Sequence, residues 1–193
     1  MPLQQKSQSS RIEILDAALD LVRSSGAFSL TIDAVAEKSG FSKGGVLYNF
    51  PTKDALIRAM VQLLADRFSQ DIETARAGYP ESDSPTVMGM IDVTESWVQR
   101  ESTVARAMLV TTLCDAGHIE PFLELKRRLK LQIEAETSDR PRDMAIWAAL
   151  EGIHFSTAHG VSVHSDEDRR VILNELRGRL ADRETNQNGK SRQ

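Results

Sequence analysis

The sequence predicts an all-α protein of about nine helices, in which an N-terminal three-helix unit precedes a larger helical body. Apolar residues recur at the helical spacing i, i+3, i+4 along most of the 193 residues, and no segment shows the alternation typical of a strand. Ser and Thr residues stand where N-caps are expected, and Gly and Pro residues separate the periodic segments. Hydrophobic residues make up 40% and charged residues 27%, as in ordinary globular domains.

The first helix is expected to start near residue 10, after a flexible arm at 1–9, and to stop at Gly26. Ile12, Leu15 and Leu19 share one face of it, so this face is expected to be buried.

Two short helices follow, separated by a tight turn. Thr31 is the expected N-cap of the first, and Gly40 lies in the turn that ends it. Ser42 is the expected N-cap of the second, which Pro51 ends. This layout is typical of a helix-turn-helix, so residues 10–52 are predicted to form a DNA-binding domain.

The remaining chain is predicted to form one body over residues 53–183, followed by a disordered tail at 184–193. Its first helix, at about 53–77, leaves the DNA-binding domain. Five more helices are expected, at about 86–101, 103–115, 119–137, 141–160 and 166–183.

Adjacent glycines occupy the second helix of the predicted helix-turn-helix, where each lowers helix stability by about 1 kcal/mol relative to alanine. A duplex that must approach this backbone closely explains their presence; the alternative is a loop carrying a surface tyrosine. Lys43 is expected to reach a guanine or a phosphate, Asn49 an adenine edge, and Tyr48 a phosphate or sugar. The predicted DNA-binding residues are Thr31, Ser42, Lys43, Gly44, Gly45, Tyr48, Asn49 and Lys53.

Residues 11–58 resemble the DNA-binding domain of the TetR family of bacterial transcriptional regulators, whose pattern is close to T-x-x-x-I-A-x-x-A-G-V-S-x-G-T-L-Y-x-x-F-x-S-K-x-x-L. Tyr48 stands one place later than the family tyrosine, because Gly45-Val46-Leu47 replaces Thr-Leu-Tyr. The pattern is represented here by Thr31, Val35, Ala36, Ser39, Gly40, Phe41, Ser42, Gly44, Phe50, Thr52, Lys53 and Leu56. The resemblance implies a C-terminal domain that binds ligands and dimerises.

The helix at 141–160 has no clearly polar side, which predicts that it is buried all round, partly by a symmetry mate. The alternative is that its faces pack within one subunit. The predicted homodimer interface comprises Ala145, Ala149, Gly152, Ser156, Gly160, Ile172, Leu176 and Leu180.

Met and aromatic residues of the C-terminal body are candidates for a largely apolar effector pocket, although such residues are commonly plain core. Glu151 is the least core-like of them, since a buried carboxylate requires a partner. The candidate pocket residues are Met88, Trp97, Met108, Thr112, His118, Phe122, Trp147, Glu151, His154 and Phe155.

Several patterns favour ordinary structural roles. The basic run at 125–130 is interspersed with glutamates, which favours a salt-bridged surface over a second nucleic-acid site. Three histidines at 154, 159 and 164 do not share a helix face, so no metal site is expected, and no cofactor motif is found. The single Cys114 is expected to be a structural thiol and permits no intrachain disulfide.

The function expected from these patterns is a transcriptional repressor that a partly apolar small molecule releases from a palindromic operator. The alternative is an effector-independent DNA-bound dimer with an architectural or protein-recruiting role. No catalytic motif such as H-E-x-x-H or G-x-S-x-G is found, so no enzyme activity is expected. The expected location is the bacterial cytoplasm, on the nucleoid when bound to DNA, without membrane association.

Overall fold

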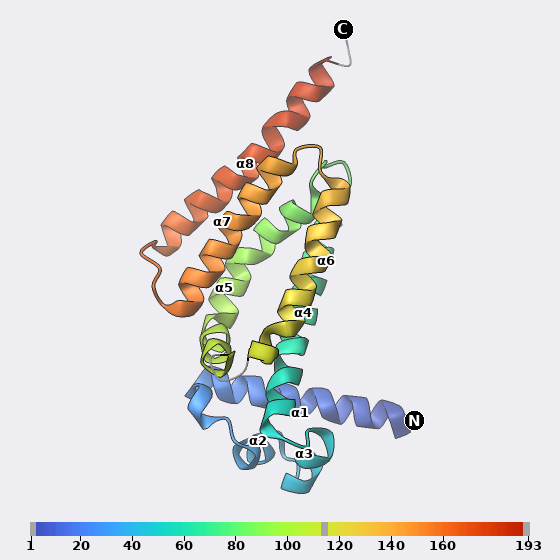
Figure 1. The fold of residues 1–193 in the computed structure, drawn as a ribbon, viewed down its shortest axis with the longest axis vertical. Helices are drawn as coiled ribbons and strands as arrows, with labels where there is room; N and C mark the ends of the chain where they lie inside the picture. The colour runs from blue at the N-terminus through green and yellow to red at the C-terminus, as the bar shows by residue number, and fades with distance from the viewer. Residues whose placement is uncertain (1–2, 113–115, 191–193) are drawn as a thin grey trace. The chain divides into compact units, whose positions relative to one another are not determined.

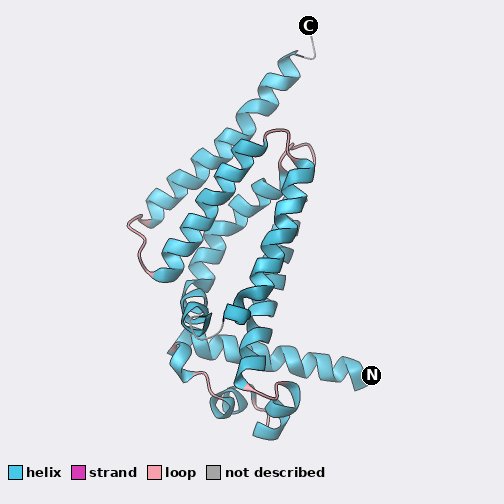
Figure 2. Cartoon of the chain, viewed as in Figure 1, coloured by secondary structure: helices cyan, strands magenta, loops and turns pink. Residues whose placement is uncertain are grey.

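The computed structural model describes residues 3–112 and 116–190, and their side chains over 8–101 and 117–181. Figures 1 and 2 show that the described chain is helical, with short connections between the helices. The elements are α1 (Leu3–Ser25), η1 (Ala27–Ser29), α2 (Ile32–Ser39), α3 (Lys43–Asn49), α4 (Lys53–Arg76), α5 (Pro85–Thr112), η2 (Ala116–Ile119), α6 (Glu120–Glu136), α7 (Arg140–His159) and α8 (Asp166–Lys190).

The chain divides into two compact units, each continuous in space but not in sequence. Unit 1 comprises residues 1–66 and 103–123, and unit 2 comprises residues 67–102 and 124–193. The units therefore divide inside α4, α5 and α6, whereas the sequence placed the domain boundary at residue 52. Each of these three helices is unbroken at the division, so no interruption of a helix marks it.

Unit 1 has a core made by one face of α1 together with α2, α3 and the start of α4. Ile14, Leu19, Val35, Val46 and Phe50 are each 0% exposed.

The expected inward position of Ile12 is wrong, because this side chain is 44% exposed while Ile14 is buried. The buried face of α1 is rotated towards the positions of Ile14, Leu15, Ala18, Leu19 and Val22. This i, i+1, i+4 pattern fits a helical stripe as well as the one containing Ile12 does.

The segment 85–112 is a single helix, α5, and the prediction of two helices at 86–101 and 103–115 is wrong. The polar stretch at 99–103 contains no Pro or Gly, so nothing in it interrupts the helix. The described chain thus has eight α-helices and two short 3-10 turns in place of the nine expected.

The helices at the two ends are longer than expected. α1 begins at Leu3, within the segment predicted as an arm, and α8 continues to Lys190, within the predicted tail. Neither extension contains a Pro, and polar residues are compatible with a helix whether or not it packs on a core.

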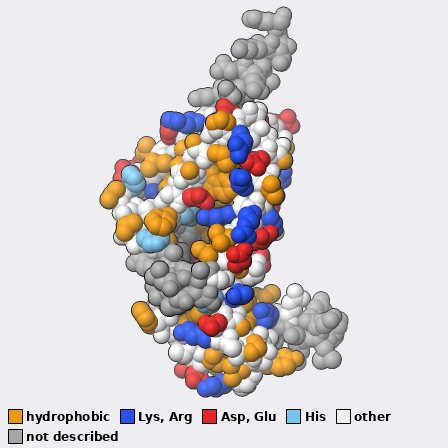
Figure 3. Space-filling model, viewed as in Figure 1, with side chains coloured by type: hydrophobic (Ala, Val, Ile, Leu, Met, Phe, Trp, Pro, Cys, Tyr) orange, Lys and Arg blue, Asp and Glu red, His pale blue; other side chains and the backbone are white. Residues whose placement is uncertain are grey.

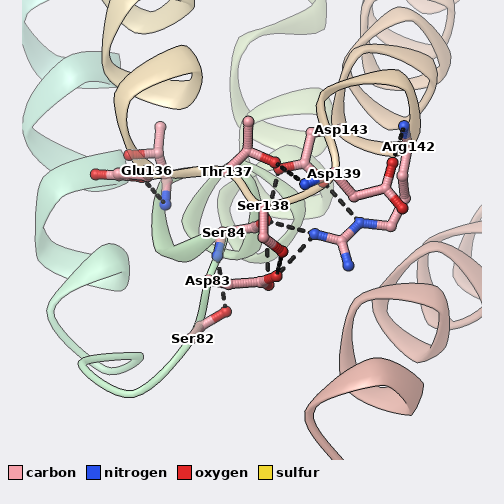
Figure 4. A network of polar contacts seen from close by, with 10 residues as sticks. Ser82, Asp83, Ser84, Glu136, Thr137, Ser138, Asp139, Arg142 and Asp143 are labelled. Atoms are coloured by element: carbon pink, nitrogen blue, oxygen red, sulfur yellow. Dashed lines mark hydrogen bonds and ion pairs between the residues drawn. The ribbon is translucent and has the colours of Figure 1, made fainter. Parts of the chain in front are cut away.

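Unit 2 contains a buried polar network at the start of α5 and of α7 (Figure 4). Asp143 and Ser84 are both 0% exposed, and the Ser84 hydroxyl donates to Asp143 Oδ2 at a distance of 2.5 Å. Arg142 donates from Nε to Asp143 Oδ1 at 2.8 Å and from Nη2 to Ser84 Oγ at 2.7 Å. The network therefore ties the first residues of α5 to the first turn of α7.

Two further carboxylates complete this junction. Burial acts to raise the pKa of Asp83, but the hydrogen bond from Ser138 and the charge of Arg142 outweigh it, so the pKa lies below its usual range. Glu136, at the end of α6, accepts the amide of Thr86 at 3.1 Å and the guanidinium of Arg76 at 2.8 Å. The carboxylate of Glu136 thus stabilises the N-terminus of α5.

Within the described residues, no helix combines the length and the apolar character needed to cross a membrane.

Candidate functional sites

The predicted helix-turn-helix is present in unit 1, and side chains close its helix ends as expected. Thr31 Oγ1 accepts the amide of Ala34 at 3.1 Å, and Ser42 Oγ accepts that of Gly45 at 3.1 Å. Gly40 ends α2 in the left-handed region, at φ 74°. A side chain is disfavoured there, so the tight turn that sets α3 against α2 depends on glycine at this position.

The two adjacent glycines of α3 differ in their surroundings. At Gly44 an added Cβ would meet nothing nearer than Ser42 Oγ at 3.9 Å, and the residue is exposed. At Gly45 an added Cβ would lie 3.3 Å from the same oxygen and 3.8 Å from Phe41. The half-buried Gly45 thus has a reason inside the chain for lacking a side chain, whereas Gly44 has none.

Lys43, the first residue of α3, forms an ion pair with Asp33 in the first turn of α2. Its ammonium lies 2.9 Å from Asp33 Oδ1 and 3.1 Å from Oδ2. Both side chains are exposed, 60% for Lys43 and 71% for Asp33. Lys43 was predicted as a DNA contact, but its pairing with Asp33 was not predicted.

Asn49 ends α3 with its side chain turned onto its own helix. Its Nδ2 donates to the carbonyl of Gly45 at 2.9 Å. The guanidinium of Arg11 donates to the Asn49 carbonyl at 2.8 Å and lies 4.3 Å from the ring centroid of the buried Phe50. Arg11 therefore attaches α1 to the end of α3; because 38 residues separate it from Asn49, no local pattern predicted this role.

The other predicted contacts are on the surface of unit 1. Tyr48 is 82% exposed, and Lys53, the first residue of α4, is exposed as well. Thr52 accepts the amide of Ala55 at 3.0 Å and caps this helix.

An aromatic cluster lies in unit 2, formed by residues of α4, α5 and α7. The ring of Phe68 meets Trp97 edge to face at a centroid distance of 4.8 Å and His154 at 5.6 Å. His154 Nε2 lies 3.2 Å from the hydroxyl of Thr94, which itself donates to the Met90 carbonyl at 2.7 Å. Trp97 and His154 of this cluster were predicted as pocket residues, whereas Phe68 and Thr94 were not.

Burial lowers the pKa of His154 to about 4, and the nearby ammonium of Lys126 acts in the same direction. Glu151 opposes these effects, but its carboxylate is bound to Lys126 at 2.8 Å. His154 is therefore neutral at pH 7. The Thr94 hydroxyl already donates its proton to the Met90 carbonyl, so it can only accept a hydrogen bond from His154. This contact therefore requires that the imidazole proton is on Nε2.

Asp71 provides the acidic group beside this cluster. One of its oxygens accepts the indole N–H of Trp97 at 2.7 Å and the guanidinium of Arg100 at 3.0 Å. The Asp71 side chain is 42% exposed, so water also reaches this carboxylate. The sequence offered no indication of this role, since 26 residues separate Asp71 from Trp97.

The remaining pocket candidates are divided between the two units. Met88 and Trp147 belong to the core of unit 2, whereas His118 and Phe122 belong to unit 1. Phe155 is 61% exposed and stacks on His159 at 3.8 Å, so its expected position inside a pocket is wrong. Glu151 is exposed and paired with Lys126. The side chains of Met108 and Thr112, and the whole of Cys114, lie outside the described residues.

The predicted dimer residues differ in exposure and fall into three groups. Ala145, Gly152 and Gly160 are exposed, and Ala149, Ser156, Ile172 and Leu176 are half-buried. Leu180 is 1% exposed and belongs to the core of its own unit, so its expected place on the interface is wrong. The expectation that α7 is buried all round does not hold within one chain, since Ala145, Ala148, Gly152 and Phe155 are on its open side.

The basic run on α6 is neutralised by neighbouring carboxylates, as predicted. Lys126 pairs with Glu151 at 2.8 Å, Arg127 with Glu124 at 3.3 Å and Lys130 with Glu134 at 3.5 Å. Figure 3 shows the same mixture of acidic and basic side chains on this part of the surface.

Comparison with known protein families gives two matches that together account for most of the chain. Residues 14–60 match the model described as bacterial regulatory proteins, tetR family. Residues 87–181 match the tetracyclin repressor-like C-terminal domain. An uncharacterized HTH-type transcriptional regulator in the dhlA 5′ region of Xanthobacter autotrophicus is 37% identical over 75 residues, which is 39% of this chain and 35% of that protein. This chain thus matches about a third of the length of that relative.

Solved structures share the fold at low sequence identity. A TetR-family transcriptional regulator from Mesorhizobium loti has a TM-score of 0.69 at 18% identity, covering 91% of this chain and 96% of that one. The multidrug binding protein EbrR in complex with proflavin has a TM-score of 0.58 at 20% identity, covering 86% and 99%. The helix-turn-helix with its capped short helices and the two family matches lead to one conclusion: this chain belongs to the TetR family of bacterial transcriptional regulators.

Proposed function

We propose that this DNA-binding regulator is a homodimeric repressor, which a small molecule bound in unit 2 releases from a palindromic operator. The observation that carries the DNA-binding part is the bare backbone at Gly44. Among the described residues, an added Cβ there would meet only Ser42 Oγ at 3.9 Å, so packing within the chain does not require glycine at this exposed position of the second helix of the helix-turn-helix. A duplex groove fits this bare backbone, because recognition helices approach base edges with their N-terminal residues.

The DNA contacts proposed for each subunit are exposed or half-buried residues of unit 1. Lys43 is proposed to contact a base edge, while Thr31, Tyr48 and Lys53 contact phosphates. Ser42, Gly44 and Gly45 have small side chains or none, so they let the backbone of the recognition helix approach the duplex closely. Asn49 can read an adenine only after it gives up its bond to the Gly45 carbonyl. For this reason we assign base reading to Lys43 before Asn49.

A homodimer is supported by the open apolar side of α7 and α8. Phe155 is 61% and Val171 60% exposed, and small residues beside them leave room for a second helix. Two-fold symmetry would pair these surfaces and present two copies of α3 to half-sites about one helical turn apart, or a multiple of it.

An effector site is proposed at the cluster of Phe68, Trp97 and His154. It combines flat aromatic surfaces, a neutral imidazole and, at Asp71, a carboxylate that water reaches. These groups suit a flat, aromatic, positively charged ligand. The neighbour EbrR has been solved with proflavin, with ethidium and with malachite green, which makes such dyes the first probes.

The test uses the full-length protein and a random duplex library. Wild-type protein is expected to enrich a palindromic motif and to elute as a dimer in size exclusion with light scattering. Titration with proflavin or ethidium is expected to quench Trp97 fluorescence and to release the labelled motif, with Trp97→Phe reporting the contribution of Trp147 alone. Quenching without release would favour the alternative, a DNA-bound dimer that does not respond to effectors. A monomer that enriches no motif would contradict the proposal as a whole.

A further inference from the structure

We propose that Asp33 is a specificity-determining residue: it holds the ammonium of Lys43 and so limits sequence-independent binding to phosphates. The inference rests on the proposed function, because it requires α2 and α3 to face DNA. It assigns a role to an acidic residue on a surface where positive charge would be expected.

The ion pair has little to do with stability. Both side chains are largely exposed, and exposed pairs contribute between zero and about 1 kcal/mol. An acidic residue in the first turn of α2 does favour the helix dipole, yet Thr31 already caps that end. Against this small gain, a carboxylate on a DNA-facing surface repels the phosphates of every duplex.

The geometry resolves this conflict. The ammonium of Lys43 has three N–H donors, and Asp33 engages it at 2.9 and 3.1 Å. At least one donor is left for a guanine O6 or N7, so Lys43 can read a base while its pair with Asp33 persists. A phosphate contact instead draws the ammonium away and leaves the carboxylate unpaired beside the DNA backbone. The pair therefore penalises contacts that carry no sequence information.

The experiment compares wild type, Asp33→Asn, Lys43→Gln and the double variant. All four are measured on the duplex that wild-type protein enriches from a random library and on a shuffled duplex of the same composition. Circular dichroism checks folding, which is expected to be unaffected because both positions are exposed.

For Asp33→Asn, the ratio of shuffled-duplex Kd to enriched-duplex Kd is expected to fall about fivefold, since the lost repulsion is comparable to one ion pair in water. The dependence of log K on log salt is expected to steepen by about 0.9 on the shuffled duplex only, as Lys43 gains one phosphate. In the Lys43→Gln background, Asp33→Asn is expected to leave both the ratio and the slope unchanged.

Two results overturn the inference while leaving the proposed function intact. If Asp33→Asn strengthens binding to both duplexes equally, Asp33 is only a general repulsive charge. If Asp33→Asn changes the salt slope by the same amount in the Lys43→Gln background as in wild type, the effect does not depend on the ion pair between Asp33 and Lys43. Wild-type protein that enriches no duplex overturns the proposed function and this inference together.

Discussion

The polar contacts of the two units differ in the distance along the chain that they bridge. In the helix-turn-helix, Thr31 and Ser42 each accept the backbone amide of the residue three positions later, and Lys43 pairs with Asp33 ten positions away. In unit 2, the bond from Ser84 to Asp143 bridges 59 residues and that from Arg177 to Asp92 bridges 85. The helix-turn-helix is thus organised by local sequence, whereas unit 2 is organised by tertiary packing.

The largest expected effect is in the buried network of unit 2. Asp143→Ala leaves Arg142 buried without its main partner, and breaking a buried pair in this way costs about 3–5 kcal/mol. Urea denaturation followed by circular dichroism measures the free energy of unfolding.

The matched control for Asp143→Ala is Glu134→Gln, which removes a carboxylate of α6 that is also paired twice but is 26% exposed. A loss of no more than about 1 kcal/mol is expected there. Equal losses in the two variants would show that burial of the network adds nothing to the free energy of unfolding. The buried long-range contacts would then stabilise the chain no more than local surface contacts do.

A pH effect is expected from His154, the neutral histidine of the aromatic cluster. Its pKa is about 4 in the folded state against 6.5 when free, so between these values the unfolded chain binds a proton that the folded chain does not. The contribution of the neutral His154 to the free energy of unfolding is therefore fully present above pH 6.5. The free energy of unfolding falls by about 3 kcal/mol as the pH decreases from 6.5 to 4.

The contribution of His154 is isolated by comparing wild type with His154→Gln across this pH range. Glutamine keeps a polar group near Thr94 but does not titrate, so the difference between the two curves is expected to decrease towards pH 4. Parallel curves would mean that His154 is protonated as easily in the folded chain as in the unfolded one.

The same contrast explains how much the sequence could predict. Caps and turns depend on neighbours in the chain, so Thr31, Gly40 and Ser42 were identified with their correct roles. The all-α class and the helix-turn-helix followed from the same local information. The continuity of α5 was missed: two helices were predicted at 86–101 and 103–115, although neither Pro nor Gly stands between them.

What could not be predicted depends on contacts between distant residues. The sequence shows that α4 has an apolar face, but only the fold brings Phe68 and Asp71 to Trp97 and His154. The same limit led to Phe155 being assigned to a pocket: a helical residue without a known neighbour can face the core or solvent equally well.

Arg11 departs from this local pattern in unit 1, because its contact with the end of α3 bridges 38 residues. Arg11→Ala removes the hydrogen bond to the Asn49 carbonyl and the cation–π contact with Phe50. A loss of about 1 kcal/mol is expected, since the guanidinium is exposed. Thermal unfolding measures it, and Arg11→Lys, which keeps the charge over the ring, is expected to lose less. If alanine and lysine behave alike, the charge over Phe50 contributes nothing.

The smallest change in stability is expected at Gly44, and it has the opposite sign. Gly44→Ala adds a Cβ into open space and is expected to stabilise α3 by about 0.5 kcal/mol, while DNA affinity decreases because the methyl group meets the duplex. Gly178→Ala, also helical and open, is the control that gains stability without loss of DNA binding. Fluorescence anisotropy on the enriched duplex separates the two. If Gly44→Ala binds as tightly as wild type, the bare backbone of α3 does not approach DNA, and the local organisation of this surface has another cause.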